Sequence, residues 1–322
     1  MNASGTAVDW LMAGDPAIRW QVMRDLLDAP EGRWRAERSR LEDEGWGAKL
    51  LSLQDPDGQW AGGAFLPADF AWEQMRTEGQ PWTATCWALT QLRELGLDPE
   101  SPSARRTVQL VGENSRWDHD GQPYWEGEVE ECINGRTVAQ GAYFGVDVAD
   151  IVEKLVSQRM ADGGWNCERE HGSVCSSFDS TINVLEGLLE FERATGGSVG
   201  SRKSRAAGEE YLLTRGLMHR LSTGELVDQE YLEFSCPSRW RYDLLRALDY
   251  FREASVFAET LPDARLSEAV EYLRSRQQAD GTWHLDKTYR GRSWFEMDSG
   301  AGQPSRWITI KALRVLRWWE NS

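Results

Sequence analysis

The sequence has no long apolar run, no excess of basic residues and only four histidines. No stretch approaches the roughly 18 apolar residues that a membrane-spanning helix needs, so we predict no membrane span. Lys and Arg total 36 against 52 Asp and Glu, which gives a formal net charge of −16. That sign disfavours binding to nucleic-acid phosphates and to anionic membranes. We therefore predict no nucleic-acid partner.

Cysteine is also scarce. There are five cysteines, an odd number at irregular spacings, and this pattern is typical of reduced thiols rather than of a disulfide framework. Residues 1–9 contain neither a basic patch nor an apolar segment, so they do not resemble a secretory signal. We therefore expect a cytoplasmic protein. The cysteines are Cys86, Cys132, Cys167, Cys175 and Cys236.

Several patterns that would identify a fold or a catalytic class are missing. No segment alternates apolar and polar residues as a half-buried strand does. The sequence has no G-x-S-x-G nucleophile motif, no P-loop and no H-E-x-x-H metal motif. The missing strand pattern predicts an all-α protein. The missing motifs argue against the common hydrolases, nucleotide-binding proteins and zinc peptidases.

Tryptophan, in contrast, is abundant, with 17 residues in a chain of 322. Three of them end the same local pattern: Asp57-Gly58-Gln59-Trp60, Asp162-Gly163-Gly164-Trp165 and Asp280-Gly281-Thr282-Trp283. Asp and Gly favour a sharp reversal of the chain. A turn that recurs between helical stretches indicates a protein built from helix pairs, with each Trp packed between neighbouring elements.

The sequence predicts five such helix pairs after a leading helical segment. That segment covers residues 1–45 and contains a helix over Ala17–Leu27, which Asp15 and Pro16 begin. A Gly/Ser-rich stretch, Thr195–Ser204, is predicted to be a mobile loop. The pairs are Gly47–Leu53 with Trp82–Leu95, Ala104–Val111 with Arg136–Phe144, Val148–Arg159 with Asp179–Ala194, Ala206–Leu221 with Trp240–Ala254, and Leu266–Gln278 with Trp307–Glu320.

A repeated tetrapeptide supports this division. Pro237-Ser238-Arg239-Trp240 and Pro304-Ser305-Arg306-Trp307 are identical, and each precedes a Leu-rich helical stretch. Pro ends a loop and Ser is a good helix cap, so both copies are predicted to begin the second, inner helix of a pair.

The last pair contains the most complete repeat, with Ala269, Tyr272, Leu273, Gln277, Gly281 and Trp283. This spacing resembles the QW motif of squalene and oxidosqualene cyclases, which occurs in looser form in protein prenyltransferase β subunits. The resemblance implies an all-α fold, a single α/α toroid with inner and outer helices, formed by residues 1–322 as one domain.

In such a toroid the ends of the inner helices face the mouth of a central cavity, and their dipoles favour anions there. The resemblance therefore implies that polar and aromatic residues at these ends bind a small apolar or aromatic molecule. The candidate substrate-binding residues are Trp82, Thr85, Arg136, Thr181, Trp240, Arg241, Tyr242 and Trp307.

One segment resembles a catalytic motif. Phe178-Asp179-Ser180-Thr181 is similar to the D-C-T segment of oxidosqualene cyclases, with Ser180 in place of Cys, and the resemblance implies that Asp179 is a proton donor. Such an acid must be held protonated among apolar groups. The D-x-D-D motif of squalene–hopene and class II diterpene cyclases is absent. The alternative is that Asp179 only caps the helix that begins there.

A metal site is a further alternative, because prenyltransferase β subunits hold zinc with Asp, Cys and His. Cys167, His171, Cys175 and Asp179 follow one another at four-residue spacings, and zinc accepts all these residue types. Gly172 interrupts the helix that this spacing needs, and the close Asp-x-Cys pair of that family is missing. We therefore predict no metal and no cofactor, with these thiols satisfied or at the surface.

Three function classes remain open. The first is acid-initiated isoprenoid cyclisation or transfer by Asp179, and the second is a binding protein that sequesters an apolar or aromatic molecule without catalysis. The third is a carbohydrate-active enzyme, which needs a carboxylate pair. The acidic residues Glu126, Glu128, Glu130 and Glu131 are instead predicted to lie in a solvated loop. Whether the chain is an enzyme is left undecided by the sequence.

Overall fold

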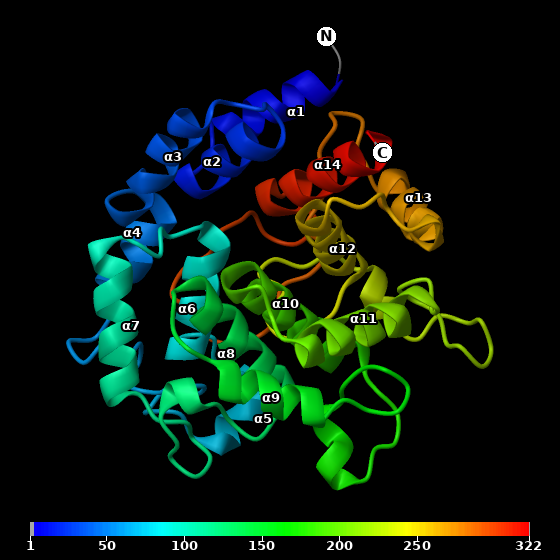
Figure 1. Cartoon of the computed structure of the whole chain (residues 1–322). Coiled ribbons are helices and arrows are strands. Elements are labelled where there is room, and N and C mark those ends of the chain that lie inside the picture. The colour runs from blue at the N-terminus through cyan, green and yellow to red at the C-terminus, as the bar shows by residue number, and fades with distance from the viewer. Residues whose placement is uncertain (1–2, 322) are drawn as a thin grey trace. The chain divides into compact units, whose positions relative to one another are not determined.

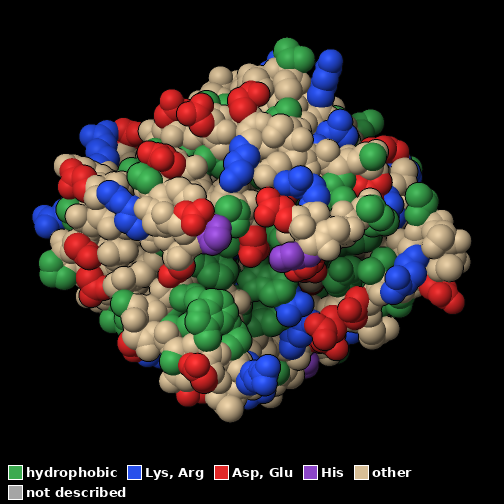
Figure 2. All heavy atoms as spheres, turned by 90° about the horizontal axis from the view of Figure 1, so that it is seen from below, with side chains coloured by type: hydrophobic (Ala, Val, Ile, Leu, Met, Phe, Trp, Pro, Cys, Tyr) green, Lys and Arg blue, Asp and Glu red, His purple; other side chains and the backbone are tan. Residues whose placement is uncertain are grey.

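The computed structural model describes residues 3–321 and consists of helices and connecting loops (Figure 1). Within that range there are only isolated β-bridges and no strand, so the predicted all-α class is confirmed. No helix within residues 3–321 is long and apolar enough to cross a membrane. On the face shown in Figure 2, acidic and basic side chains are interspersed and some apolar side chains are exposed among them.

The chain divides into two compact units. Unit 1 comprises Met1–Ala48, Leu212–Tyr289 and Glu296–Ser322, and unit 2 comprises Lys49–Tyr211 and Arg290–Phe295. Each unit is described by itself below. The expectation of one closed domain over residues 1–322 therefore stays a prediction.

Unit 1 combines helices from both ends of the chain. The helix α14 packs against α12, α2 and α1. The short 3-10 helices of this unit are Arg40–Glu42, Gln229–Leu232 and Ala264–Leu266. Its α-helices are α1 (Ala3–Met12), α2 (Pro16–Asp25), α3 (Glu31–Ser39), α12 (Leu244–Ala258), α13 (Ser267–Ser275) and α14 (Arg306–Glu320).

Unit 2 contains the central helices of the chain. The packing of α8 against α10 dominates it, and α6 and α9 also contact α8. Its 3-10 helices are Trp72–Gln74, Tyr124–Glu126 and Cys167–His171. Its α-helices are α5 (Met75–Glu78), α6 (Thr85–Leu95), α7 (Pro102–Asn114), α8 (Glu131–Tyr143), α9 (Ala149–Ser157) and α10 (Phe178–Thr195), while α4 (Gly45–Ser52) and α11 (Val199–Leu213) run across the unit boundaries.

The predicted helix pairs are present, but several bounds differ. The predicted loop Thr195–Ser204 is only partly a loop, because α11 begins within it at Val199, where the Ser198 hydroxyl accepts a hydrogen bond from the Ser201 amide at 3.0 Å. Helix α8 begins at Glu131, well before the predicted Arg136. The leading segment holds α1 and α3 as well as the predicted helix around α2.

The two identical Pro-Ser-Arg-Trp tetrapeptides differ in whether their serine caps a helix. Ser305 caps α14 as predicted, by accepting from the Ile308 amide at 3.0 Å. In the other copy, Asp243 caps α12 and the helix begins only at Leu244. The Ser238 hydroxyl instead donates to the Ser235 carbonyl at 3.4 Å. The prediction that both serines cap inner helices is therefore wrong for Ser238.

The three tryptophans of the D-G-x-W turns are fully buried and make the same hydrogen bond. Each indole Nε1 donates to the backbone carbonyl ten residues earlier in the chain, near the end of the preceding helix. A buried indole NH needs such a partner, so this bond fixes the angle between helix and turn. The pairs are Trp60 to Leu50 at 2.9 Å, Trp165 to Leu155 at 2.8 Å and Trp283 to Leu273 at 2.8 Å.

Each turn is also tied to the inner helix that follows it. The backbone amide of each tryptophan donates to a buried threonine hydroxyl in the first turns of that helix. These bonds join Trp60 to Thr85 at 3.2 Å, Trp165 to Thr181 at 3.1 Å and Trp283 to Thr309 at 3.0 Å. The predicted role of the D-G-x-W tryptophans in joining neighbouring helices is therefore present in all three copies.

Candidate functional site

Two glycines bring the start of α8 beside the start of α10 (Figure 1). A Cβ at Gly135 would lie 2.6 Å from the Asn183 carbonyl oxygen, and one at Gly187 would lie 2.3 Å from the Gly135 carbonyl oxygen. The two backbones thus approach closely, which only residues without a side chain permit. We call the residues at and beside these helix starts the α8–α10 mouth: Glu130, Cys132, Cys167, Asp179 and Ser180.

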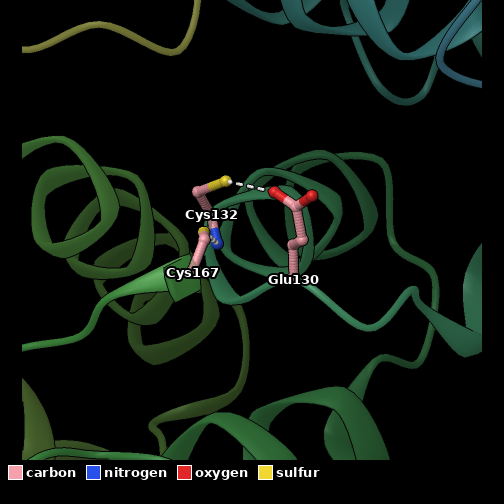
Figure 3. Close-up of side chains that lie close together, drawn as sticks. All are labelled: Glu130, Cys132 and Cys167. Carbon is pink, nitrogen blue, oxygen red and sulfur yellow. Dashed lines mark hydrogen bonds between the residues drawn. The ribbon is translucent and has the colours of Figure 1, made fainter. Parts of the chain in front are cut away.

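Three metal-ligating side chains lie together in this mouth. Each of Glu130, Cys132 and Cys167 offers a ligand atom, and these atoms all lie within 4.8 Å of one another (Figure 3). The Cys132 thiol donates to Glu130 Oε2 at 3.5 Å. Glu130 and Cys132 come from the start of α8, whereas Cys167 begins the 3-10 helix that precedes α10.

The Cys167 sulfur accepts two hydrogen bonds. The backbone amide of Cys132 donates to Cys167 Sγ at 3.3 Å, and the Ser180 hydroxyl donates to the same atom at 3.3 Å. The Cys132 amide belongs to the first turn of α8. These two bonds connect the 3-10 helix that begins at Cys167 to the first turns of α8 and α10.

The segments that carry these residues are held in place by further bonds. The Asn134 amide group accepts from the Glu128 backbone NH at 2.7 Å and donates to the Glu128 carbonyl at 2.6 Å. Arg169 Nε donates to the buried carboxylate of Glu131 at 2.9 Å. Glu128 and Glu131 are both buried, so the prediction that the acidic run is a solvated loop is wrong for these two residues.

Two pKa values in the mouth are raised. Desolvation raises the pKa of Glu130, and the nearby charges of Glu128 and Glu168 add to the effect. The hydrogen bond with Cys167 and then burial raise the pKa of the Cys132 thiol well above its ordinary value. Both shifts have the direction expected where burial and neighbouring groups disfavour the ionised form.

Asp179 lies in the first turn of α10 and is half-buried. The helix cap is Ser177, whose hydroxyl accepts from the Ser180 amide at 3.0 Å. The interpretation of Asp179 as the capping residue is therefore wrong. The Asp179 backbone carbonyl accepts from Asn183 Nδ2 at 2.7 Å, which connects this turn to the interior of unit 2.

Arg136, a predicted binding residue, is buried in that interior. Its guanidinium donates to Asn183 Oδ1 at 2.7 Å and to Thr90 Oγ1 at 3.2 Å. The guanidinium carbon also lies 5.1 Å from the centre of the Trp87 ring. Arg136 is thus part of a buried polar network between α6, α8 and α10, and Asn183 links this network to the turn that carries Asp179.

Three other predicted binding residues of unit 2 have structural partners. Thr85 and Thr181 hold the turn tryptophans, as described above. Trp82 Nε1 donates to the Arg290 carbonyl at 3.0 Å, and its ring packs edge-on against Trp87 with centroids 4.8 Å apart. All three side chains are buried.

The remaining predicted binding residues belong to unit 1. The Tyr242 hydroxyl donates to the Leu217 carbonyl at 2.6 Å, and Arg241 stacks over the Trp240 ring at 3.9 Å. Trp307 stacks on Trp46 with ring centroids 5.9 Å apart. The Trp307 Nε1 atom is buried without a hydrogen-bond partner among the described residues.

Of the cysteines and histidine considered as metal ligands, only Cys167 joins a cluster. His171 is exposed, with Nδ1 3.0 Å from Glu168 Oε2, and Cys175 is also exposed. Within residues 3–321, Cys167 instead lies with Glu130 and Cys132, and these three side chains could hold a metal ion. The sequence interpretation missed the last two, although a Glu-x-Cys pair before a helix was a signal that could have found them.

Unit 1 contains a separate surface cavity of about 810 Å³. Its lining includes His219, Arg220 and Glu268, and His219 Nε2 lies 3.1 Å from a Glu268 oxygen. None of the predicted site residues lines this cavity.

Two solved structures are similar to this chain over almost its whole length. One is described as a crystal structure of a protein from Actinoplanes, with 16% identity, 99% of this chain and 98% of that chain covered, and a TM-score of 0.46. The other is the apo structure of the type II terpene cyclase MstE from Scytonema, with 14% identity, coverage of 98% and 96%, and a TM-score of 0.45. No family model and no curated protein matches the sequence.

Proposed function

We propose that this chain binds a small apolar or aromatic molecule and that the α8–α10 mouth contacts the polar part of that ligand. The observation that carries the proposal is the cluster of Glu130, Cys132, Cys167 and Ser180 beside the starts of α8 and α10, with Asp179 next to Ser180 in the chain. Ligand sites combine apolar surroundings with a few polar groups of this kind. The apolar nature of the ligand rests on the resemblance of the repeats to the QW motif.

A second function, acid-initiated isoprenoid cyclisation, is favoured by one observation. Because Ser177 caps α10, the Asp179 carboxylate is not the helix cap. Its position in the first turn works against an acid, however, because the positive end of α10 stabilises the carboxylate. A proton donor must be neutral before it reacts. Ligand binding without catalysis therefore ranks above cyclisation.

Tryptophan fluorescence tests the binding proposal. Farnesol and squalene should quench the emission saturably, whereas cellohexaose should leave it unchanged. Saturable quenching by cellohexaose alone would instead support the carbohydrate-active alternative. No saturable change with any of the three compounds would contradict small-molecule binding of the proposed class.

The role of Asp179 is tested by Asp179→Asn, with Asp150→Asn as the matched control. Asp150 lies in the first turn of α9 and is exposed. In the binding proposal, wild type shows no turnover of squalene or of its epoxide, and Asp179→Asn changes ligand affinity while Asp150→Asn does not. Turnover by wild type that is lost only in Asp179→Asn would place cyclisation first.

A further inference from the structure

Glu130, Cys132 and Cys167 have the chemistry and the spacing of a zinc site. In a tetrahedral site with ordinary zinc–sulfur and zinc–oxygen bonds, neighbouring ligand atoms are roughly 3.5–3.8 Å apart. The three ligand atoms here already lie within 4.8 Å of one another, and Cys132 Sγ and Glu130 Oε2 are 3.5 Å apart. Small side-chain adjustments would bring them around one ion.

We propose that Glu130, Cys132 and Cys167 bind a zinc ion at the α8–α10 mouth. Two thiolates select zinc over the hard cations Mg²⁺ and Ca²⁺, which prefer oxygen ligands. Three protein ligands leave the fourth tetrahedral position for a water molecule or for a ligand atom. The zinc proposal does not depend on the proposed small-molecule ligand, because it concerns only the chain's own side chains.

Hydrogen bonds and an ion pair from neighbouring residues hold the three side chains in place, as metal ligands require. The Ser180 hydroxyl and the Cys132 amide both donate to the Cys167 sulfur, so they hold this sulfur in place, as supporting groups around a metal ligand do. Arg169 pairs with the buried Glu131 and so ties the 3-10 helix that begins at Cys167 to the first turn of α8. The site is therefore ordered by contacts outside the ligand set.

Charge balance supports a cation. Glu128 accepts from the Glu130 backbone amide at 2.7 Å, so a further carboxylate lies beside the three ligands. Two thiolates and a carboxylate carry three negative charges, and a divalent ion lowers this to one. The nearby cations bind other groups: Lys154 donates to the Glu128 carbonyl at 2.5 Å and Arg169 to the Glu131 carboxylate at 2.9 Å. A divalent ion would therefore supply positive charge at the three ligand atoms themselves.

Direct metal analysis tests the proposal. Tag-free protein should be purified under reducing conditions, equilibrated with Zn²⁺, dialysed and analysed by mass spectrometry of the metal content. We expect a single zinc ion per chain. Replacement by Co²⁺ should give the visible absorption of a tetrahedral cobalt site with thiolate ligands. Folded wild-type protein that retains no zinc and gives no such absorption would overturn the proposal.

Matched variants locate the ion. Cys132→Ser and Cys167→Ser should lose bound zinc, whereas Cys175→Ser should retain it, because Cys175 is exposed and outside the cluster. Glu130→Gln should weaken binding, and its control is Glu126→Gln, which changes an exposed residue of the same acidic run. Ser180→Ala should weaken zinc binding by roughly 10-fold or more, as is typical for a group that supports a metal ligand.

Two results would contradict the assignment. Equal zinc affinity in wild type and in folded Cys132→Ser would show that the ion lies elsewhere. A thiol titration of unreduced, denatured protein that finds two fewer thiols than the five cysteines, with the full count restored in Cys132→Ser apart from the replaced residue, would indicate a disulfide that involves Cys132 instead. If the cysteine variants do not fold, the test is the comparison of Glu130→Gln with Glu126→Gln. A zinc affinity that is unchanged in folded Glu130→Gln would also reject the site.

Discussion

The backbone amide of Trp165 donates to the hydroxyl of Thr181 at 3.1 Å, and the Trp165 indole donates to the Leu155 carbonyl at 2.8 Å. One tryptophan thereby holds the end of α9, its own turn and the start of α10 together. The same two bonds recur at Trp60 and Trp283. Thr181 thus has a structural role at the helix start that carries Asp179.

Replacement of the turn tryptophan in the most complete repeat should be costly. Trp283 is fully buried and makes both bonds, so Trp283→Ala should lower the free energy of unfolding by roughly 3–5 kcal/mol. Chemical denaturation followed by circular dichroism measures this change. Trp72→Ala is the control, because Trp72 is 68% exposed, and it should change stability by less than about 0.5 kcal/mol. Similar small changes in both variants would reject the structural role of Trp283.

Thr181 distinguishes a structural role from ligand binding. Thr181→Val leaves the buried Trp165 amide without its partner, and this should cost about 1–3 kcal/mol. Thr181→Ser keeps the hydroxyl and should recover most of that loss. Thermal unfolding measures the stability and fluorescence titration with farnesol measures the affinity. A large loss of affinity with unchanged stability in Thr181→Val would favour the predicted substrate contact instead.

The contact between α8 and α10 should not tolerate a side chain. Gly187→Ala places a methyl group 2.3 Å from the Gly135 carbonyl, so the helices must separate, at a cost of about 1–3 kcal/mol or more. The affinity for zinc should fall as well, because Glu130 and Cys132 lie at the start of α8, whereas Cys167 lies in the 3-10 helix that precedes α10. Gly32→Ala in α3 has no atom within 4 Å of the new Cβ, and it should be neutral or slightly stabilising in the same denaturation assay.

The buried ion pair of unit 1 predicts a pH dependence. Arg314 Nε donates to Asp249 Oδ1 at 2.7 Å, and both side chains are buried. Burial raises the pKa of Asp249, but the charges of Arg314 and Arg252 outweigh this and bring the pKa below its ordinary 3.8. A lowered folded-state pKa means that the stabilisation is present above the ordinary value and is lost as the pH falls through the folded-state value.

Asp249→Asn should therefore destabilise the protein by roughly 3–5 kcal/mol at pH 7, because the buried Arg314 guanidinium loses its bidentate carboxylate partner and keeps only the longer carboxylate contact with Asp25 at 3.4 Å. The difference from wild type should shrink as the pH falls below about 4, where wild type loses the same charge. Urea unfolding at several pH values measures both effects. Asp28→Asn removes an exposed partner of Arg317 and should have little effect at any pH. A pH-independent difference for Asp249→Asn would contradict the ionic explanation.

Local patterns predicted the helical class because their causes lie within a few residues. The D-G-x-W turns follow helices as expected, and the Asp57 and Asp280 carboxylates each accept from the backbone amide two residues later. Ser305 caps α14 through a neighbour three residues away. The identical Ser238 does not cap a helix, because Asp243 follows it and accepts from the Arg246 amide at 2.8 Å. A cap motif therefore indicates a helix start only when no better acceptor follows.

The sequence by itself determined the helical periodicity, the turns and the scarcity of basic residues. Only the tertiary structure decided which polar residues meet. Cys132 and Cys167 are 35 residues apart, and they come together because Gly135 and Gly187 let two helix backbones approach closely. Such a contact depends on packing between distant segments, which no spacing along the chain encodes. Burial by distant segments is also why the prediction of a solvated loop for the acidic run is wrong for Glu128 and Glu131, which are buried where α8 begins.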